Sequence, residues 1–100
     1  MIDITFRQNG ELYLKAEGHA EFSLGDDIVC AAVSTLIETL ASYISQKGNC
    51  HGGITLGKGY AEIIDGNLQD LPFFEITLHG LSLISADYPK NVRITPTCRF

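Results

Sequence analysis

The sequence predicts a two-layer α+β domain, in which one sheet packs against two helices in the order β-β-α-β-β-α-β. Three observations predict this fold. Apolar and polar residues alternate on both sides of Asn9-Gly10, a helical period follows up to about Lys47, and a second hairpin-and-helix pattern then repeats the first. One hundred residues suffice for one compact domain, so we expect residues 1–100 to fold as a single unit.

The first half of the chain is expected to form a hairpin and then a long helix. Residues 2–7 and 12–17 alternate as half-buried strands, and Asn9-Gly10 between them favours a tight turn because both residues tolerate positive φ. The helix should run from Asp27 to about Lys47, with Asp26 or Asp27 as its cap. Its apolar face recurs at three- and four-residue steps: Val29, Val33, Leu36, Leu40 and Ile44.

A second hairpin is predicted from residues 53–56 and 60–64, with Gly57-Lys58-Gly59 as its turn. The same segment imitates a phosphate-binding loop, because a glycine is followed after four residues by Gly-Lys. Gly59 stands where that motif needs a hydroxyl, and a strand is expected where the motif needs a helix. We therefore interpret the segment as a hairpin turn.

A second helix is expected over about residues 69–88. Pro72 is tolerated only in a first helical turn, which places Asp70 near the cap. Residues 91–95 should form the last strand. The apolar residues expected on the buried face of this helix are Phe74, Leu78 and Leu81.

Composition and charge narrow the functional classes. The net charge of −5, with seven scattered basic residues, argues against nucleic-acid binding and suits a basic partner. No stretch approaches the roughly 20 apolar residues that span a bilayer, and residues 1–7 lack the pattern of a signal peptide. We therefore expect a cytoplasmic protein with no membrane partner. A domain this small has a modest core, so a homodimer is also expected.

The cysteines are expected to be reduced thiols, because the cytoplasm keeps thiols reduced and three is an odd number. Cys50-His51, with Cys98 and His79, invites a metal interpretation, but the chain has no Cys-x-x-Cys pair, which structural zinc sites normally show. We therefore expect no metal and no cofactor.

The segment with the most chemical information contains His19 and Cys30. His19 ends a predicted strand and Cys30 lies in the first turn of a predicted helix, so the intervening loop can return the imidazole to the thiol. A cysteine nucleophile needs such a partner, because only the thiolate attacks and an imidazolium stabilises it. The partial positive charge of the helix N-terminus favours the thiolate, whereas the negative charges of Asp26 and Asp27 disfavour it. These two effects are of similar size, so His19 must supply most of the activation. The alternative is a core cysteine, since Val29, Ala31 and Ala32 surround it.

Gly18-His19-Ala20, followed by Asp27-Ile28-Val29-Cys30-Ala31 and then Ser34, resembles the signature of the ribosomal-processing cysteine proteases of the Prp family. The element order and the chain length are also similar. This resemblance implies a bacterial cysteine endopeptidase that removes a short N-terminal extension from large-subunit ribosomal protein twenty-seven, whose basic N-terminal segment would be the partner. It implies His19 as the catalytic histidine and Cys30 as the nucleophile.

In this scheme His19 takes the thiol proton and later protonates the leaving amine, while the N–H groups of Cys30 and its neighbours face the oxyanion. Asp27 and Ser34 match further motif positions. Asp27 would cap the helix or orient His19, with capping favoured because it needs only local geometry. Ser34 would bond near the site or back to a carbonyl of its own helix.

The chain departs from the family in its substrate loop. Members often have a longer, glycine-richer loop, whereas only one glycine occurs among Glu21, Phe22, Ser23, Leu24 and Gly25. The cleavage-site preference is therefore left open.

Two rival functions remain. One is a non-enzymatic, dimeric binding module associated with the ribosome, in which Cys30 is a buried core residue. The other is a thiol redox sensor that joins Cys30 to Cys50 or Cys98.

Overall fold

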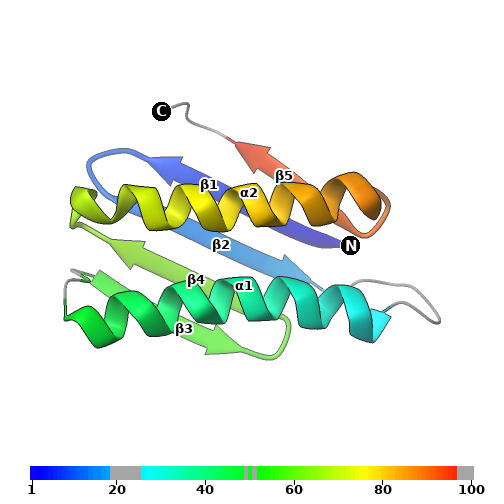
Figure 1. Cartoon of the computed structure of the whole chain (residues 1–100), viewed down its shortest axis with the longest axis horizontal. Helices are drawn as coiled ribbons and strands as arrows, with labels where there is room; N and C mark the ends of the chain where they lie inside the picture. Colours follow the sequence, from blue (N-terminus) through cyan, green and yellow to red (C-terminus); the bar gives the residue numbers. More distant parts are fainter. Residues whose placement is uncertain (19–25, 49, 51, 97–100) are drawn as a thin grey trace.

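The structure is a computed structural model that describes residues 1–18, 26–48, 50 and 52–96, with the side chains of these residues except Asp26, Asp27 and Pro96. Its element order is β-β-α-β-β-α-β, as the sequence predicts, and the fold class is therefore confirmed. Five strands form one sheet in the order β3-β4-β2-β1-β5. Both helices cover the same face of this sheet, α1 over β3 and β4 and α2 over β1 and β5 (Figure 1).

The sheet is antiparallel except at one edge. The hairpin of β1 (Ile2–Gln8) and β2 (Leu12–Gly18) pairs Ile4 with Ala16, and β2 then pairs with β4 (Tyr60–Asp65). The second hairpin joins β3 (Gly52–Gly57) to β4. The last strand, β5 (Val92–Pro96), lies parallel to β1 because α2 carries the chain back along the sheet. The predicted strands are therefore all present, with ends that differ by at most one residue.

The segment with the phosphate-loop spacing forms the second hairpin. Residues Gly57 to Tyr60 turn from β3 into β4, so a strand follows the Gly-Lys pair, and no phosphate loop is built there. Gly59 has φ +72°, which a glycine adopts without cost.

The long helix α1 (Asp26–Lys47) begins one residue before the predicted start. Four of its five predicted core residues are buried, but Leu36 is only half-buried. Ile37 and Ala41 are buried and complete the core face of the helix instead. Leu36 lies toward α2, where its side chain would touch a Cβ added at Gly80, so the glycine lets the two helices approach closely.

The second helix is preceded by a short 3₁₀ turn (Leu68–Asp70), and α2 itself spans Leu71–Asp87. Asp70 is the N-cap residue and Pro72 lies in the first turn, as expected. Phe74 and Leu81 are fully buried, whereas Leu78 is half-buried and Thr77 takes the core position. The Thr77 hydroxyl donates to the Phe73 carbonyl at 2.8 Å, so its polar group is satisfied within the helix.

The core lies between the helices and the inner face of the sheet. The rings of Phe6 and Phe74 pack against each other within it, tilted by 41° and with centroids 6.0 Å apart. The buried apolar residues come from every strand except β3 and from both helices: Ile2, Ile4, Phe6, Leu12, Leu14, Ala16, Val29, Val33, Ile37, Leu40, Ala41, Ile44, Ile63, Phe74, Leu81 and Val92.

The segment Ile28–Lys47 is long and apolar enough, by length and composition, to cross a membrane. The expectation that no stretch approaches that size was therefore wrong. A core helix of a globular domain passes the same test, and Val29, Val33 and Ile44 in this segment belong to the core between helix and sheet.

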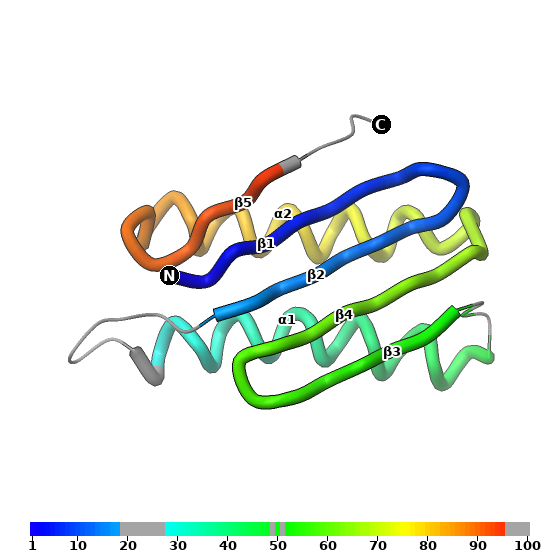
Figure 2. Tube along the Cα trace, turned by 180° about the vertical axis from the view of Figure 1, so that it is seen from behind, coloured from blue at the N-terminus to red at the C-terminus, as the bar shows by residue number. Residues whose placement is uncertain are grey.

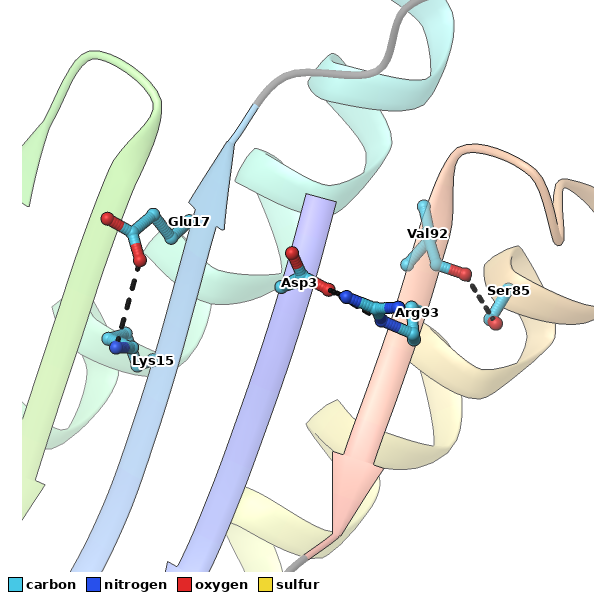
Figure 3. Close-up of polar contacts among 6 residues, drawn as sticks. All are labelled: Asp3, Lys15, Glu17, Ser85, Val92 and Arg93. Carbon is cyan, nitrogen blue, oxygen red and sulfur yellow. Dashed lines mark hydrogen bonds and ion pairs between the residues drawn. The ribbon is translucent and has the colours of Figure 1, made fainter. Parts of the chain in front are cut away.

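No described helix covers the outer face of the sheet, as the view from behind shows (Figure 2). Charged side chains of β1, β2 and β5 lie on this face. An Arg93 Nη2 atom lies 2.7 Å from Oδ1 of Asp3, and Lys15 Nζ lies 3.7 Å from Oε1 of Glu17 (Figure 3). Ser85 Oγ donates to the Val92 carbonyl at 2.9 Å and ties α2 to β5. The two faces thus differ: one forms the core, and the other carries ion pairs in solvent.

Candidate active site

Three segments converge at one end of the sheet: the end of β2, the first half of α1 and the β3–β4 turn. The backbone N–H of Gly18 donates to the Gly59 carbonyl at 2.9 Å, which ties the end of β2 to this turn. Between α1 and the hairpin the chain leaves a groove of about 350 Å³. Figure 1 shows the turn beside the N-terminal half of α1.

Gly18 is the last described residue before His19, and only glycine fits there. Its φ is +112°, and a Cβ at this position would overlap the carbonyl oxygen of Met1. An L-residue at this φ is strained by its own backbone, apart from the contact. Glycine therefore lets the end of β2 lie close against β1.

Cys30 is half-buried on α1 and lines the groove. Part of its side chain packs against the core, but it also faces the open space. This contradicts the alternative in which Cys30 is a fully buried core residue. The thiol lies where a peptide in the groove could reach it.

The observed helix start changes one detail of the expected chemistry. Because α1 begins at Asp26, Cys30 is the fifth helical residue and lies just beyond the first turn. The N–H groups that lack a partner within a helix are its first four, so the N–H of Cys30 can bond back to the Asp26 carbonyl. The N–H groups that helix geometry leaves without a partner therefore precede Cys30, and the expected role of Cys30 and its neighbours toward an oxyanion stays a prediction.

The structure brings Ser34 to the same groove as Cys30. Ser34 is exposed, lines the groove and lies four residues further along α1, which places it on the same helix face. Asp27 belongs to the first turn of α1, but its side chain is outside the described part. His19 and the substrate loop Glu21–Gly25 also lie outside the described residues, so the pairing of His19 with Cys30 stays a prediction.

The groove has residues that the sequence reasoning did not select. Its floor and walls are largely apolar, with Val33 and Ile37 from α1 and Leu56 and Ala61 from the hairpin. Leu56 is 51% exposed although it lies on the helix side of the sheet, opposite Ala61. Of the residues whose side chains the structure describes, Glu38 and Lys58 are the charged ones that line the groove. Glu38 could have been found from the four-residue spacing of Cys30, Ser34 and Glu38, whereas the hairpin needed the tertiary structure.

Tyr60 also borders the groove, but its ring belongs to the outer face. It pairs with Glu17 across the strands and lies on the same side as Glu62. Partial burial raises the pKa of the Tyr60 phenol, and the Glu62 and Glu17 carboxylates raise this pKa further. Tyr60 is therefore neutral at physiological pH.

Cys50 differs from Cys30 in position and environment. Its thiol donates weakly to the Ile64 carbonyl at 3.5 Å, and burial raises the pKa of this thiol, to which Asp65 and Asp70 add. Cys50 follows the end of α1, whereas Cys30 lies near its start, so about 25 Å of helix separates them. A disulfide needs Cα atoms less than about 7 Å apart, which excludes a Cys30–Cys50 bridge in this fold. Cys98, the other proposed bridging partner, lies outside the described residues.

The metal site considered for Cys50, His51, His79 and Cys98 is not formed among the described residues. His79 is exposed on α2, and among residues 1–18, 26–48, 50 and 52–96 no group of three or more His, Cys, Asp or Glu side chains could hold a metal ion. His51 and Cys98 lie outside these ranges.

The groove and its cysteine occur in a chain with recognisable relatives. The crystal structure of SMU.848 from Streptococcus mutans is 30% identical, with a TM-score of 0.81 over 99% of both chains. The essential ribosomal processing protease Prp from S. aureus, solved in complex with a substrate peptide, is 23% identical, with a TM-score of 0.78 over 96% of this chain and 97% of that one. A hypothetical protein from Staphylococcus aureus is 18% identical, with a TM-score of 0.67 over 96% and 97%.

No curated protein is recognisably similar to the chain in sequence. The family described as cysteine protease Prp matches residues 1–93, which include the groove, Cys30 and the β3–β4 turn. Because this match covers nearly the whole chain, the protein belongs to the cysteine protease Prp family and is a cysteine peptidase.

Proposed function

We propose that this peptidase removes a short N-terminal extension from a bacterial large-subunit ribosomal protein, with Cys30 as nucleophile and His19 as its base. The observation that carries this proposal is the position of Cys30, half-buried and open to a groove beside a helix start. The S. aureus Prp, which has a similar fold, is a ribosomal processing protease and was solved in complex with a substrate peptide. The domain limits 1–100 and a cytoplasmic location are part of the proposal.

The reaction follows from these two residues. His19 accepts the proton of the Cys30 thiol, and the thiolate attacks the scissile carbonyl carbon, so a carbon–sulfur bond forms and the carbonyl oxygen becomes an anion. The carbon–nitrogen bond then breaks as His19 protonates the leaving amine. A water molecule, which gives its proton to His19, attacks the thioester and releases the acid and the thiol.

The first turn of α1 supports the anionic intermediate. Its N–H groups before Cys30 lack partners within the helix and carry the positive end of the helix dipole. Such donors stabilise the developing oxyanion, and the loss of one donor in other enzymes costs about 10²–10³ in kcat. Asp27, in this turn, would cap the helix or orient His19. Ser34, further along the groove, would bond to substrate or to its own helix.

The partner that we propose is a basic N-terminal segment, which the net charge of −5 attracts at long range. Neither nucleic acid nor a membrane is proposed as a partner. We also propose a homodimer, because α2 exposes Ile76 and Leu83 on its outer side, with 72% and 58% of their surfaces accessible. Sedimentation that shows a monomer at high micromolar concentration would contradict the dimer.

The two cysteines provide an internal test of the catalytic assignment. At neutral pH an alkylating reagent should modify Cys30 before Cys50, and alkylation of Cys30 should become slower in His19→Ala. Cleavage of a peptide that carries the extension should be lost in Cys30→Ala and retained in Cys50→Ala, with folding checked by circular dichroism. A Cys30→Ala protein that still cleaves would disprove the assignment, and unchanged alkylation in His19→Ala would remove His19 from the mechanism.

A further inference from the structure

The groove wall on α1 carries a row of three polar side chains. Cys30, Ser34 and Glu38 follow one another at four-residue steps, and all three line the groove. Residues at this spacing lie above one another on one helix face. The row therefore leads from the Cys30 thiol to a carboxylate along α1, and a peptide bound along this row would pass from Cys30 to Glu38.

The Glu38 carboxylate is placed to meet a substrate. Its side chain is exposed, and none of the ion pairs between described residues involves it. Its neighbours along the groove, Val33, Ile37 and Leu56, are apolar, so a cation bound here would be partly shielded from water. Lys58 on the hairpin turn is the oppositely charged residue of the same lining.

The helix geometry gives the spacing between Cys30 and Glu38 along α1, which can be expressed as a number of substrate residues. Eight residues of α-helix rise about 12 Å. An extended peptide advances about 3.3–3.4 Å per residue. A peptide whose scissile carbonyl lies at Cys30 would therefore bring its third or fourth residue from the cleaved bond level with Glu38.

We propose that Glu38 is a specificity residue that binds a lysine or arginine side chain of the substrate three or four residues from the scissile bond. This inference rests on the proposed peptidase function and adds to it a substrate position at which the groove binds a basic side chain. Lys58 limits the preference, because it repels a second cation near the turn.

The test measures kcat/KM for one cleavable peptide and for variants in which lysine or glutamine occupies the third and fourth positions on either side of the cleaved bond. The wild-type protein should favour lysine at one of these positions. Glu38→Gln should lower kcat/KM for that lysine peptide about two- to fivefold, the effect of one partly exposed ion pair. The loss should appear in KM rather than kcat, because the contact is made equally in the ground state.

The matched control is Glu75→Gln. Glu75 is exposed on α2 outside the groove, so both variants change the net charge by the same amount. Glu75→Gln should leave the lysine preference unchanged, and Glu38→Lys should convert it into a preference for glutamate at the same position. Raising the salt concentration from 0.1 to 1 M should reduce the preference in the wild type and not in Glu38→Gln.

Two failures remain distinguishable. Continued cleavage with the same lysine preference in Glu38→Gln and Glu75→Gln would overturn the role of Glu38 and leave the peptidase intact. If the wild-type protein cleaves none of the peptides, the proposed function itself fails, and the Glu38 inference fails with it.

Discussion

Gly18 connects the stability of the sheet to the position of the proposed catalytic histidine. We expect Gly18→Ala to be strongly destabilising for two separate reasons. Its φ of +112° strains any L-residue by about 1–3 kcal/mol, and its Cβ would overlap the Met1 carbonyl oxygen. Moving the backbone to relieve such an overlap costs about 1–3 kcal/mol more. The free energy of unfolding should therefore fall by about 2–6 kcal/mol.

Three other glycines separate the two causes. Gly10 has φ +78° with open space around it, so Gly10→Ala tests strain alone. A Cβ at Gly52 would overlap the Ile64 carbonyl oxygen at an ordinary φ, so Gly52→Ala tests the contact alone. Gly53 has neither problem, and Gly53→Ala should be neutral or stabilising by up to about 1 kcal/mol.

Denaturant and thermal unfolding followed by circular dichroism would measure the series. For a chain of this size 1 kcal/mol shifts Tm by about 4–8 °C, so Gly18→Ala should melt at least about 8 °C below the wild type. Any protein that remains folded should cleave peptide more slowly, because residue 18 directs the chain into His19. The reasoning would be refuted if Gly18→Ala were no less stable than Gly10→Ala, since the contact with Met1 would then cost nothing.

Two further predictions concern the core and the second cysteine. Phe74→Ala should lower the free energy of unfolding by about 3–5 kcal/mol, because its buried ring packs on Phe6. Glu75→Ala, at an exposed position of the same helix, should change it by less than about 0.5 kcal/mol, and equal losses would contradict the packing. The rate at which Cys50 reacts with iodoacetamide should reach half of its maximum at a higher pH in the folded protein than in urea. The reason is that burial raises the pKa of the Cys50 thiol and leaves less thiolate at a given pH. The same pH dependence in the folded protein and in urea would refute this prediction.

The sequence by itself determined the element order and nearly all element positions. Strict alternation on both sides of Asn9-Gly10 leaves only one arrangement that buries Ile4, Phe6 and Leu14 together, and the structure has that hairpin. Pro72 likewise restricted the start of α2, because a proline is tolerated only in the first turn. These are local constraints, which is why a single sequence reveals them.

The core face of α1 shows where local pattern reaches its limit. The three- and four-residue steps fit both Leu36 and Ile37, and periodicity does not choose between adjacent apolar residues. The choice depends on the second helix: Leu36 turns toward Gly80 of α2, and Ile37 then faces the sheet. Only the packing of two helices on one sheet decides this.

The candidate site divides in the same way. Its cysteine could be selected from the sequence because the spacing of His19 and Cys30, and the resemblance that contains it, lie within one short segment. The groove could not, because it brings the stretch of α1 from Cys30 to Glu38 together with a hairpin some 25 positions further along the chain. That proximity depends on the strand order, which is a long-range property. The sequence therefore determined which residue reacts in our proposal, while the tertiary structure decided what surrounds the substrate, since side chains distant in the chain become neighbours only when the sheet forms.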